Sequence, residues 1–253
     1  MTDETPLADA PPLLAYRRLA AARQRILSGA ANRIPLASVA SQARALGLWD
    51  GRQAKPGDEA QFALLMDLGV FEPVGGHGPA LERQARAAAP APGSDDAVML
   101  AALAAARFGL WRVLGPHPAG GVRLVPMAGA ATEAWVMDTG LAQAAPGAGV
   151  AARLAFPEGT GFGLTCGALA PCDTGVLQRL LLDLAPPRDA PVIPALPAPD
   201  DAAVLERLLA QPATRARVAA LLGTEGLAAR AWRAALDLGL MGPVPDRTPE
   251  PRA

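Results

Sequence analysis

Hydrophobic residues recur at three- and four-residue steps through the first hundred residues, the period of amphipathic helices. The pattern predicts helices over residues 13–28, 35–45, 59–68, 81–88 and 97–106, of which the first three end at Gly29, Gly47 and Gly69. Asp58 is expected to cap the third helix, and Ser94 or Asp95 the fifth. Residues 13–106 should therefore form a helical region that follows a disordered tail, 1–12.

Beyond residue 106 the chain changes to short apolar runs separated by glycine and proline, which is the spacing of strands. Runs at 108–114, 122–125, 134–137, 150–156 and 162–169 predict a small antiparallel sheet or barrel-like module. Asp173 should cap a helix over 175–184. The β module with this flanking helix is expected to span 107–185.

Residues 186–200 hold six prolines and are expected to form an extended linker. Helical periodicity returns over 201–243, and the tail 244–253 should be disordered. The predicted fold class is α+β: an N-terminal helical region, the β module, and C-terminal helices after a Pro-rich linker. The linker suggests that these last helices move independently, so that a fragment over 58–185 folds alone.

The stretch FPEGTGFGLTCGALAPC, Phe156 to Cys172, combines closely spaced glycines with both cysteines of the chain. Its glycines lack the spacing of a dinucleotide fingerprint, and the stretch has no lysine for a P-loop. The two cysteines stand further apart than zinc or redox pairs usually do. We interpret the stretch as a hairpin turn followed by a strand, in which the cysteines act as small apolar residues and Gly163 and Gly167 leave room for neighbouring strands or a bulge.

Four segments of this region carry a resemblance to a known module. They are ARFGLWRV (106–113), GGVRLV (120–125), WVMDTGLA (135–142) and GAGVAARLAFPEGTGFGLTCGALAP (147–171). The pattern resembles a module of uncharacterised bacterial proteins, some of which also carry an SEC-C tail, a short cysteine-rich zinc motif. This chain has no cysteine after Cys172, so the resemblance implies the module without the zinc site of that tail.

Basic residues are concentrated near the N-terminus although the net charge of the chain is only −1. Between Tyr16 and Lys55 there are seven arginines and one lysine against a single acid, Asp50. Lys55 is the only lysine, and the abundance of Arg, Ala, Gly and Pro indicates a GC-rich bacterial genome. The arginines therefore form either a solvated helix face or a surface for an acidic partner or nucleic acid; a weak helix-turn-helix pattern lies in the same region.

Candidate catalytic groups are sparse. No serine lies in a nucleophile elbow. His77 and His117 both stand in turns rich in glycine and proline, which explains them without chemistry. Trp111 is either a core anchor or, with Arg112 and Trp135, part of an aromatic and basic platform. We therefore predict no catalytic, cofactor-binding or metal-binding residue, and a hydrolase that uses His77 or His117 is the least favoured class.

The sequence favours a bacterial protein without catalysis that acts as an interaction or adaptor module for a protein partner. Nucleic-acid binding through the arginine-rich helices is the alternative. The N-terminus is acidic and has no apolar signal region, and the apolar runs are too short for a membrane span, so we expect a cytoplasmic protein with no membrane association. The possible interaction surface consists of Arg17, Arg18, Arg23, Arg25, Arg33, Arg44, Trp111, Arg112 and Trp135.

Overall fold

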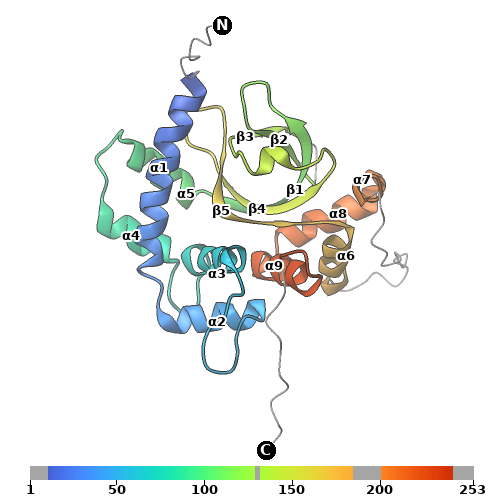
Figure 1. Cartoon of the computed structure of the whole chain (residues 1–253), viewed down its shortest axis with the longest axis horizontal. Helices are drawn as coiled ribbons and strands as arrows, with labels where there is room; N and C mark the ends of the chain where they lie inside the picture. The colour runs from blue at the N-terminus through green and yellow to red at the C-terminus, as the bar shows by residue number, and fades with distance from the viewer. Residues whose placement is uncertain (1–10, 129–131, 185–200, 242–253) are drawn as a thin grey trace, which may run out of the picture.

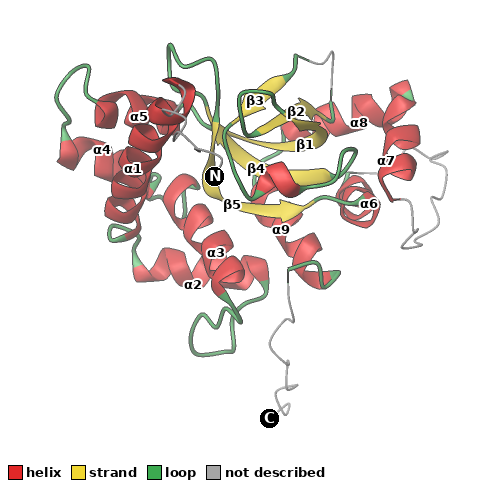
Figure 2. Ribbon diagram, turned by 45° about the horizontal axis from the view of Figure 1, so that its top comes forward, coloured by secondary structure: helices red, strands yellow, loops and turns green. Residues whose placement is uncertain are grey.

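The computed structural model describes residues 11–128, 132–184 and 201–241 of the 253-residue chain. Helices precede and follow one curled antiparallel sheet, so the chain has the predicted α+β fold (Figures 1 and 2). The predicted linker 186–200 and tail 244–253 lie outside the described residues. The predicted tail 1–12 also lies outside them as far as residue 10, and the first helix begins at Pro11, earlier than the sequence pattern predicts.

The helices before the sheet are α1 (Pro11–Ala31), α2 (Leu36–Leu46), α3 (Glu59–Phe71), α4 (Ala80–Ala88) and α5 (Asp95–Ala104). The predicted caps hold: the Asp58 side chain accepts a hydrogen bond from the Gln61 N–H, and Ser94 caps α5 through the Ala97 N–H. Gly47 ends α2 in the left-handed conformation. In the part of the chain that the structure describes, none of the helices is long and apolar enough to cross a membrane.

Gly29 lies inside α1, which continues to Ala31, and Gly69 does not end α3, so both predicted stops are wrong. The helix continues to Phe71, and Gly69 is buried inside it. A β-carbon at this position would lie 2.7 Å from the Ile34 side chain, so the glycine permits a close approach between α3 and the chain entering α2. The residue is therefore small because of packing between distant segments, which a local stop signal cannot reveal.

The sheet has the order β3-β2-β1-β4-β5, and every neighbouring pair is antiparallel. Its strands are β1 (Arg107–Pro116), β2 (Val122–Pro126), β3 (Ala134–Val136), β4 (Gly149–Ala155) and β5 (Leu164–Pro171), with the short 3-10 helix η1 (Leu141–Gln143) between β3 and β4. The sheet curls so far that its two edges meet at one point. The Gly163 N–H donates to the Trp135 carbonyl at 2.8 Å, and the Met137 N–H donates to the Gly163 carbonyl at 2.9 Å.

The curl encloses a small core of aliphatic side chains from the sheet and η1. Its buried members are Val113, Val122, Leu124, Val136, Leu141, Val150, Ala152 and Leu154. Gly163 joins the two edges through its backbone. A side chain there would collide with the ring of Phe156, which lies 2.6 Å from where a β-carbon would be. The sequence predicts that Gly163 leaves room for a neighbouring strand or a bulge, whereas the group that occupies this room is the side chain of Phe156.

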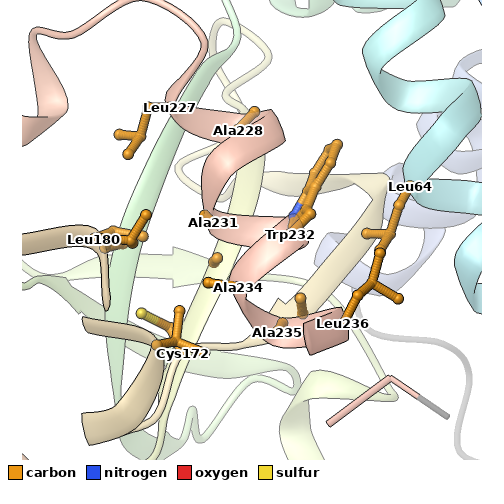
Figure 3. Close-up of a cluster of buried hydrophobic side chains, with 14 of the residues drawn as sticks. Leu64, Cys172, Leu180, Leu227, Ala228, Ala231, Trp232, Ala234, Ala235 and Leu236 are labelled. Atoms are coloured by element: carbon orange, nitrogen blue, oxygen red, sulfur yellow. The ribbon is translucent and has the colours of Figure 1, made fainter. Parts of the chain in front are cut away.

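The helices after the sheet are α6 (Thr174–Asp183), α7 (Asp201–Ala210), α8 (Pro212–Leu222) and α9 (Leu227–Asp237), and they belong to the main core. Trp232 of α9 is fully buried, and its ring meets that of Phe108 of β1 edge to face, with centroids 5.4 Å apart. Figure 3 shows α9 presenting alanines and Trp232 to Leu64 of α3, Leu180 of α6 and Cys172. This packing argues against the expected independence of the C-terminal helices and against a separately folding fragment 58–185.

Replacing Trp232 by alanine is expected to lower the free energy of unfolding by about 3–5 kcal/mol, because a fully buried indole leaves a large cavity. Urea unfolding followed by circular dichroism measures this loss. Leu36→Ala is the matched control, since Leu36 is 87% exposed and its truncation should change the value by no more than about 0.5 kcal/mol. Equal stability of the two variants would contradict the central position of α9.

A chain that ends at Leu184 is expected to lose cooperative unfolding, because it removes α7, α8 and α9 from the shared core. The amide region of its ¹H–¹⁵N spectrum should be poorly dispersed, whereas the full chain should give a dispersed spectrum. A well-dispersed spectrum of the shortened chain would show that the C-terminal helices form a separate unit after all.

Candidate binding pocket

Arg153 is the centre of a buried polar cluster between β4 and α3. Every residue of β4 is buried, and the Arg153 side chain is only 8% exposed. Its Nε donates to Asp67 Oδ2 at 3.3 Å, and its Nη2 donates to Glu72 Oε1 at 2.6 Å. The guanidinium also lies over the ring of Phe71, 4.5 Å from the centroid. Helix α3 thus supplies two carboxylates and an aromatic face to one cation.

Strand β5 bulges opposite Arg153. Pairing between β4 and β5 passes from Ala152–Leu169 to Leu154–Thr165, so three residues of β5, from Cys166 to Ala168, face the single residue Arg153. Gly167 lies in the middle of the bulge with φ at +110°, a conformation that L side chains rarely adopt. The predicted bulge at Gly167 is confirmed, and it carries the edge of the sheet around the buried guanidinium.

A pocket of about 180 Å³ opens beside this cluster and is lined by residues of α1, α3 and β5. Its walls are mostly apolar, and Asp67 is the carboxylate among its lining residues. The lining residues are Leu27 and Ala31 of α1, Ala63, Met66, Asp67, Val70 and Phe71 of α3, and Cys166, Gly167 and Ala168 of β5. We call this site the α1–α3–β5 pocket.

Asp67 is electrostatically unusual. Its side chain is 1% exposed, and its Oδ1 has no hydrogen-bond partner among the residues that the structure describes. Burial raises the pKa of Asp67 to about 7, against the opposing effect of the Arg153 charge, and the Glu72 carboxylate raises it further. The pocket therefore contains an acid that exchanges its proton near neutral pH.

The thiol of Cys166 contributes no reactive group to this pocket. Burial raises its pKa well above the usual range, and the Asp67 carboxylate acts in the same direction. Cys166 and Cys172 are both free and buried, which confirms that they act as small apolar residues within and beside the sheet.

The arginines that the sequence singles out at the N-terminus mostly contact other parts of the chain. Arg18 and Arg25 pair with Asp95 and Asp96 at the start of α5, at 3.3 and 2.5 Å. Arg23 Nη1 donates to the Thr165 carbonyl of β5 at 2.5 Å.

The remaining members of this set are also engaged. Arg33 Nε donates to Gln84 Oε1 at 2.8 Å, and the Arg44 guanidinium lies 4.3 Å from the centroid of the Trp49 ring. Arg17 likewise interacts within the chain. These arginines therefore connect α1 with α5 and β5, and α2 with the loop after it. They do not form one open basic face.

The predicted aromatic and basic platform is not assembled. Trp111 packs on the core inside the curl and donates its indole N–H to the Ala152 carbonyl at 3.2 Å. The neighbouring Arg112 pairs with Glu206 of α7 at 3.2 Å. Trp135 donates to the Gly120 carbonyl at 2.7 Å and stacks on His117, with ring centroids 4.2 Å apart. The Trp111 side chain thus serves the core, which is the first of the two alternatives that the sequence leaves open.

Neither histidine reaches a pocket with an acid. His77 is exposed in a tight turn with Val74, and His117 closes a turn in which its Nδ1 accepts from the Ala119 N–H at 3.2 Å. A second pocket, of about 230 Å³, lies between Arg112, Met127 and helices α7 and α8, and it too has no histidine among its lining residues. In the described part of the chain Thr165 Oγ1 donates to Asp138 Oδ2 at 2.6 Å, but this hydroxyl is buried and lines neither of these two pockets.

Sequence analysis misses the polar cluster, although each of its central members leaves a signal. Asp67 is the one charged residue in the apolar run 63–71, and Arg153 is the one charged residue in the run 149–156. Opposite charges isolated in two runs that are otherwise buried predict a pair across the core, since buried charges need partners. Their meeting at one pocket, however, depends on how α3 docks on the sheet.

Comparisons with known proteins give no further assignment: no protein-family model matches the chain, and no curated protein or solved structure is similar to it. Function must therefore be argued from the site itself.

Replacing Gly167 by alanine should lower the free energy of unfolding by about 1–3 kcal/mol, because the positive φ is strained for any L side chain although the space beside it is open. Gly223→Ala is the matched control: Gly223 has φ of −85°, and a β-carbon there makes only an ordinary contact. It should leave stability unchanged or slightly higher. Chemical unfolding of both variants checks the bulge, and equal losses would contradict it.

Stability should fall as pH rises from about 4 to about 7, because the pKa of Asp67 is near 7 in the folded chain and near 3.9 in the unfolded one. In this interval the folded chain retains a proton that the unfolded chain has released. Each unit of difference corresponds to about 1.4 kcal/mol, so we expect a loss of a few kcal/mol.

Asp67→Asn removes this titration while other groups keep theirs. The unfolding free energies of the variant and the natural chain are measured in urea at pH 4.5, 5.5, 6.5 and 7.5, in about one-unit steps across the expected interval. Their difference at each pH isolates the contribution of Asp67. The variant should gain relative to the natural chain as pH rises. A difference that does not change with pH would refute the raised pKa.

Proposed function

We propose that the chain is a non-catalytic protein-interaction module that receives a side chain of its partner in the α1–α3–β5 pocket. The observation that carries this proposal is the pocket itself, which combines apolar walls with one deeply buried carboxylate and has no nucleophile–base pair. Interfaces often depend on a single anchor residue that fills such a pocket. An adaptor role is also the function that the sequence favours.

The size of the pocket supports a side chain over a cofactor. Ligand and cofactor sites usually occupy about 300–1,000 Å³, whereas this pocket has about 180 Å³. A nucleotide would not fit, and the residues around the pocket include no glycine-rich loop that leads into a helix N-terminus. The volume suits one side chain of a partner protein whose remaining contact with this surface is shallow.

Nucleic-acid binding, the alternative from the sequence, has less support. Arg18 and Arg25 pair with acids, and Arg23 donates to a backbone carbonyl, so a phosphate contact would compete with existing partners. The acids Asp95 and Asp96 stand on the same surface and would repel a phosphate chain. The resemblance to bacterial proteins with an SEC-C tail remains a proposal, as does a cytoplasmic location.

Blocking the pocket tests the proposed function. Ala31→Phe places a ring among the lining residues, and Ala21→Phe adds the same bulk at an exposed position of the same helix. The tagged full chain and both variants, each checked for folding, would capture partners from bacterial lysate after nuclease treatment and at high salt. We expect a protein that the natural chain and Ala21→Phe retain and that Ala31→Phe loses, confirmed afterwards with the purified partner.

Three outcomes would count against this function. Identical capture by all three chains would place the interaction elsewhere. Loss of the captured material after nuclease would favour nucleic acid. Capture of no protein under any condition would remove the support for an adaptor role.

A further inference from the structure

The charges that contact one another at Asp67 do not balance within their own cluster. The Arg153 guanidinium faces two carboxylates, Asp67 of α3 and Glu72 near the end of the same helix, so their sum is −1 when both are ionised. Of the other ionisable groups packed around this point, the Cys166 thiol of β5 is neutral. Arg23 of α1 acts on Cys166 and donates to the Thr165 carbonyl. Within the cluster of Arg153, Asp67 and Glu72, one negative charge is therefore left without a cation in direct contact.

A second cation would find one acceptor there. Asp67 Oδ2 and Glu72 Oε1 already accept from Arg153, while Asp67 Oδ1 has no partner among the described residues and Asp67 lines the pocket. A guanidinium is a rigid fork that prefers two acceptors, whereas an ammonium is a compact charge that can use one. The arrangement therefore suits an ammonium better than a guanidinium.

The rest of the pocket suits an alkyl stem. Leu27, Val70 and Met66 line it, and methionine adapts its shape to what it contacts. A lysine side chain has an aliphatic stem that packs on apolar surface and a charged head that seeks an acceptor. An acidic ligand would meet the unbalanced carboxylates, and a purely apolar one would leave Oδ1 without a partner.

We propose that the α1–α3–β5 pocket binds a primary alkylammonium group, supplied by a lysine of the protein partner, with the stem against α1 and α3 and the ammonium on Asp67 Oδ1. This inference rests on the proposed function and gives the partner residue its chemistry. Asp67 supplies the carboxylate of the lining, Arg153 and Glu72 contact or neighbour it in the cluster behind the pocket, and Gly167 adds no side chain to the wall.

Proton and ammonium compete for the same carboxylate, so binding should depend on pH. Since burial raises the pKa of Asp67 to about 7, the ionised form that binds the ammonium is scarce at pH 5.5 and predominant at pH 8, where the amine itself stays charged. Apparent affinity scales with the fraction in the competent form. We expect affinity to rise by about tenfold or more between these pH values.

The test is a titration of the ¹⁵N-labelled full chain with small probes, followed by ¹H–¹⁵N spectra. The probes are Nα-acetyl-lysine methylamide, the norleucine and arginine analogues, and n-butylammonium against n-butanol. Lysine and butylammonium should shift the signals of pocket residues at millimolar concentration, at least fivefold more tightly than norleucine or butanol, the neutral partners of the same shape. Arginine should bind more weakly than lysine.

Asp67→Asn should abolish the preference for the ammonium and the pH dependence while it keeps the shape of the side chain. Glu72→Gln removes one charge at the rim of the cluster and should weaken ammonium binding by less than Asp67→Asn does. If Asp67→Asn does not fold, Ala31→Phe provides the control that should lose all probes, and Ala21→Phe the one that should keep them.

Equal affinity for lysine and norleucine, no pocket shifts with any amine, or an affinity that ignores pH would each overturn the inference. The two proposals can fail separately. Amine binding without any protein partner would retain the ammonium site and refute the adaptor function. A partner that depends on the pocket, together with no amine binding, would retain the function and refute the lysine.

Discussion

The Arg153 guanidinium is buried on β4, a strand inside the sheet, and the packing of α3 on the sheet depends on it. A guanidinium does not lose its proton in a protein, and its transfer from water costs several kcal/mol unless other charges and hydrogen bonds compensate. The compensation comes from α3, whose carboxylates Asp67 and Glu72 and whose Phe71 ring all face it. These three contacts fix how α3 is rotated about its own axis on the sheet.

Helix α3 is consequently buried on most of its circumference. Leu64, Leu65 and Leu68 belong to the core that contains α9, while Val70 belongs to the core that contains α1 and α5. A helix that is apolar nearly all round requires neighbours on several sides. The sheet, α9 and the N-terminal helices provide them, so α3 joins two cores that the chain order alone would separate.

Helix α9 shows how a chain poor in aromatic residues fills its interior. Half of the residues are hydrophobic, but only 4% are aromatic. The interior must be closely packed, so each of the few large rings fills a large share of the core volume. Trp232 does so in the middle of a helix whose other buried positions include Ala228, Ala231 and Ala235. Small residues on one side allow close approach, and the indole bridges to Phe108 of the sheet.

Much of the fold follows from periodicity and local chemistry, since helix and strand periods, the caps at Asp58 and Ser94, and the bulge at Gly167 are properties of neighbouring residues. The packing of the helices on one another and on the sheet depends instead on residues that are far apart in the sequence. Asp95 and Asp96 look like ordinary helix N-terminal acids, yet they also hold Arg18 and Arg25, more than seventy positions away.

The candidate pocket likewise depends on contacts between segments that are far apart in the sequence. Its lining comes from residues 27–31, 63–71 and 166–168, three segments that no local pattern connects. Sequence could reveal that Asp67 and Arg153 each stand alone in an apolar run, and therefore that they need partners. It could not reveal that one carboxylate oxygen of Asp67 would remain without a partner, or that Asp67 would line a pocket.

The charge count beside the pocket differs from that of a simple buried ion pair. One carboxylate is enough to neutralise one buried guanidinium, and an apolar substitute for a buried pair is often at least as stable. Here a second carboxylate is present, and the pKa of Asp67 rises mainly because burial disfavours its ionised form, with the charge of Glu72 acting in the same direction. A purely structural contact gains nothing from that cost, whereas a site that must attract a cation needs an excess negative charge held in a low dielectric. The proposed ammonium would supply the cation that the second carboxylate lacks; without such a ligand, Glu72 serves only as a second acceptor for Arg153.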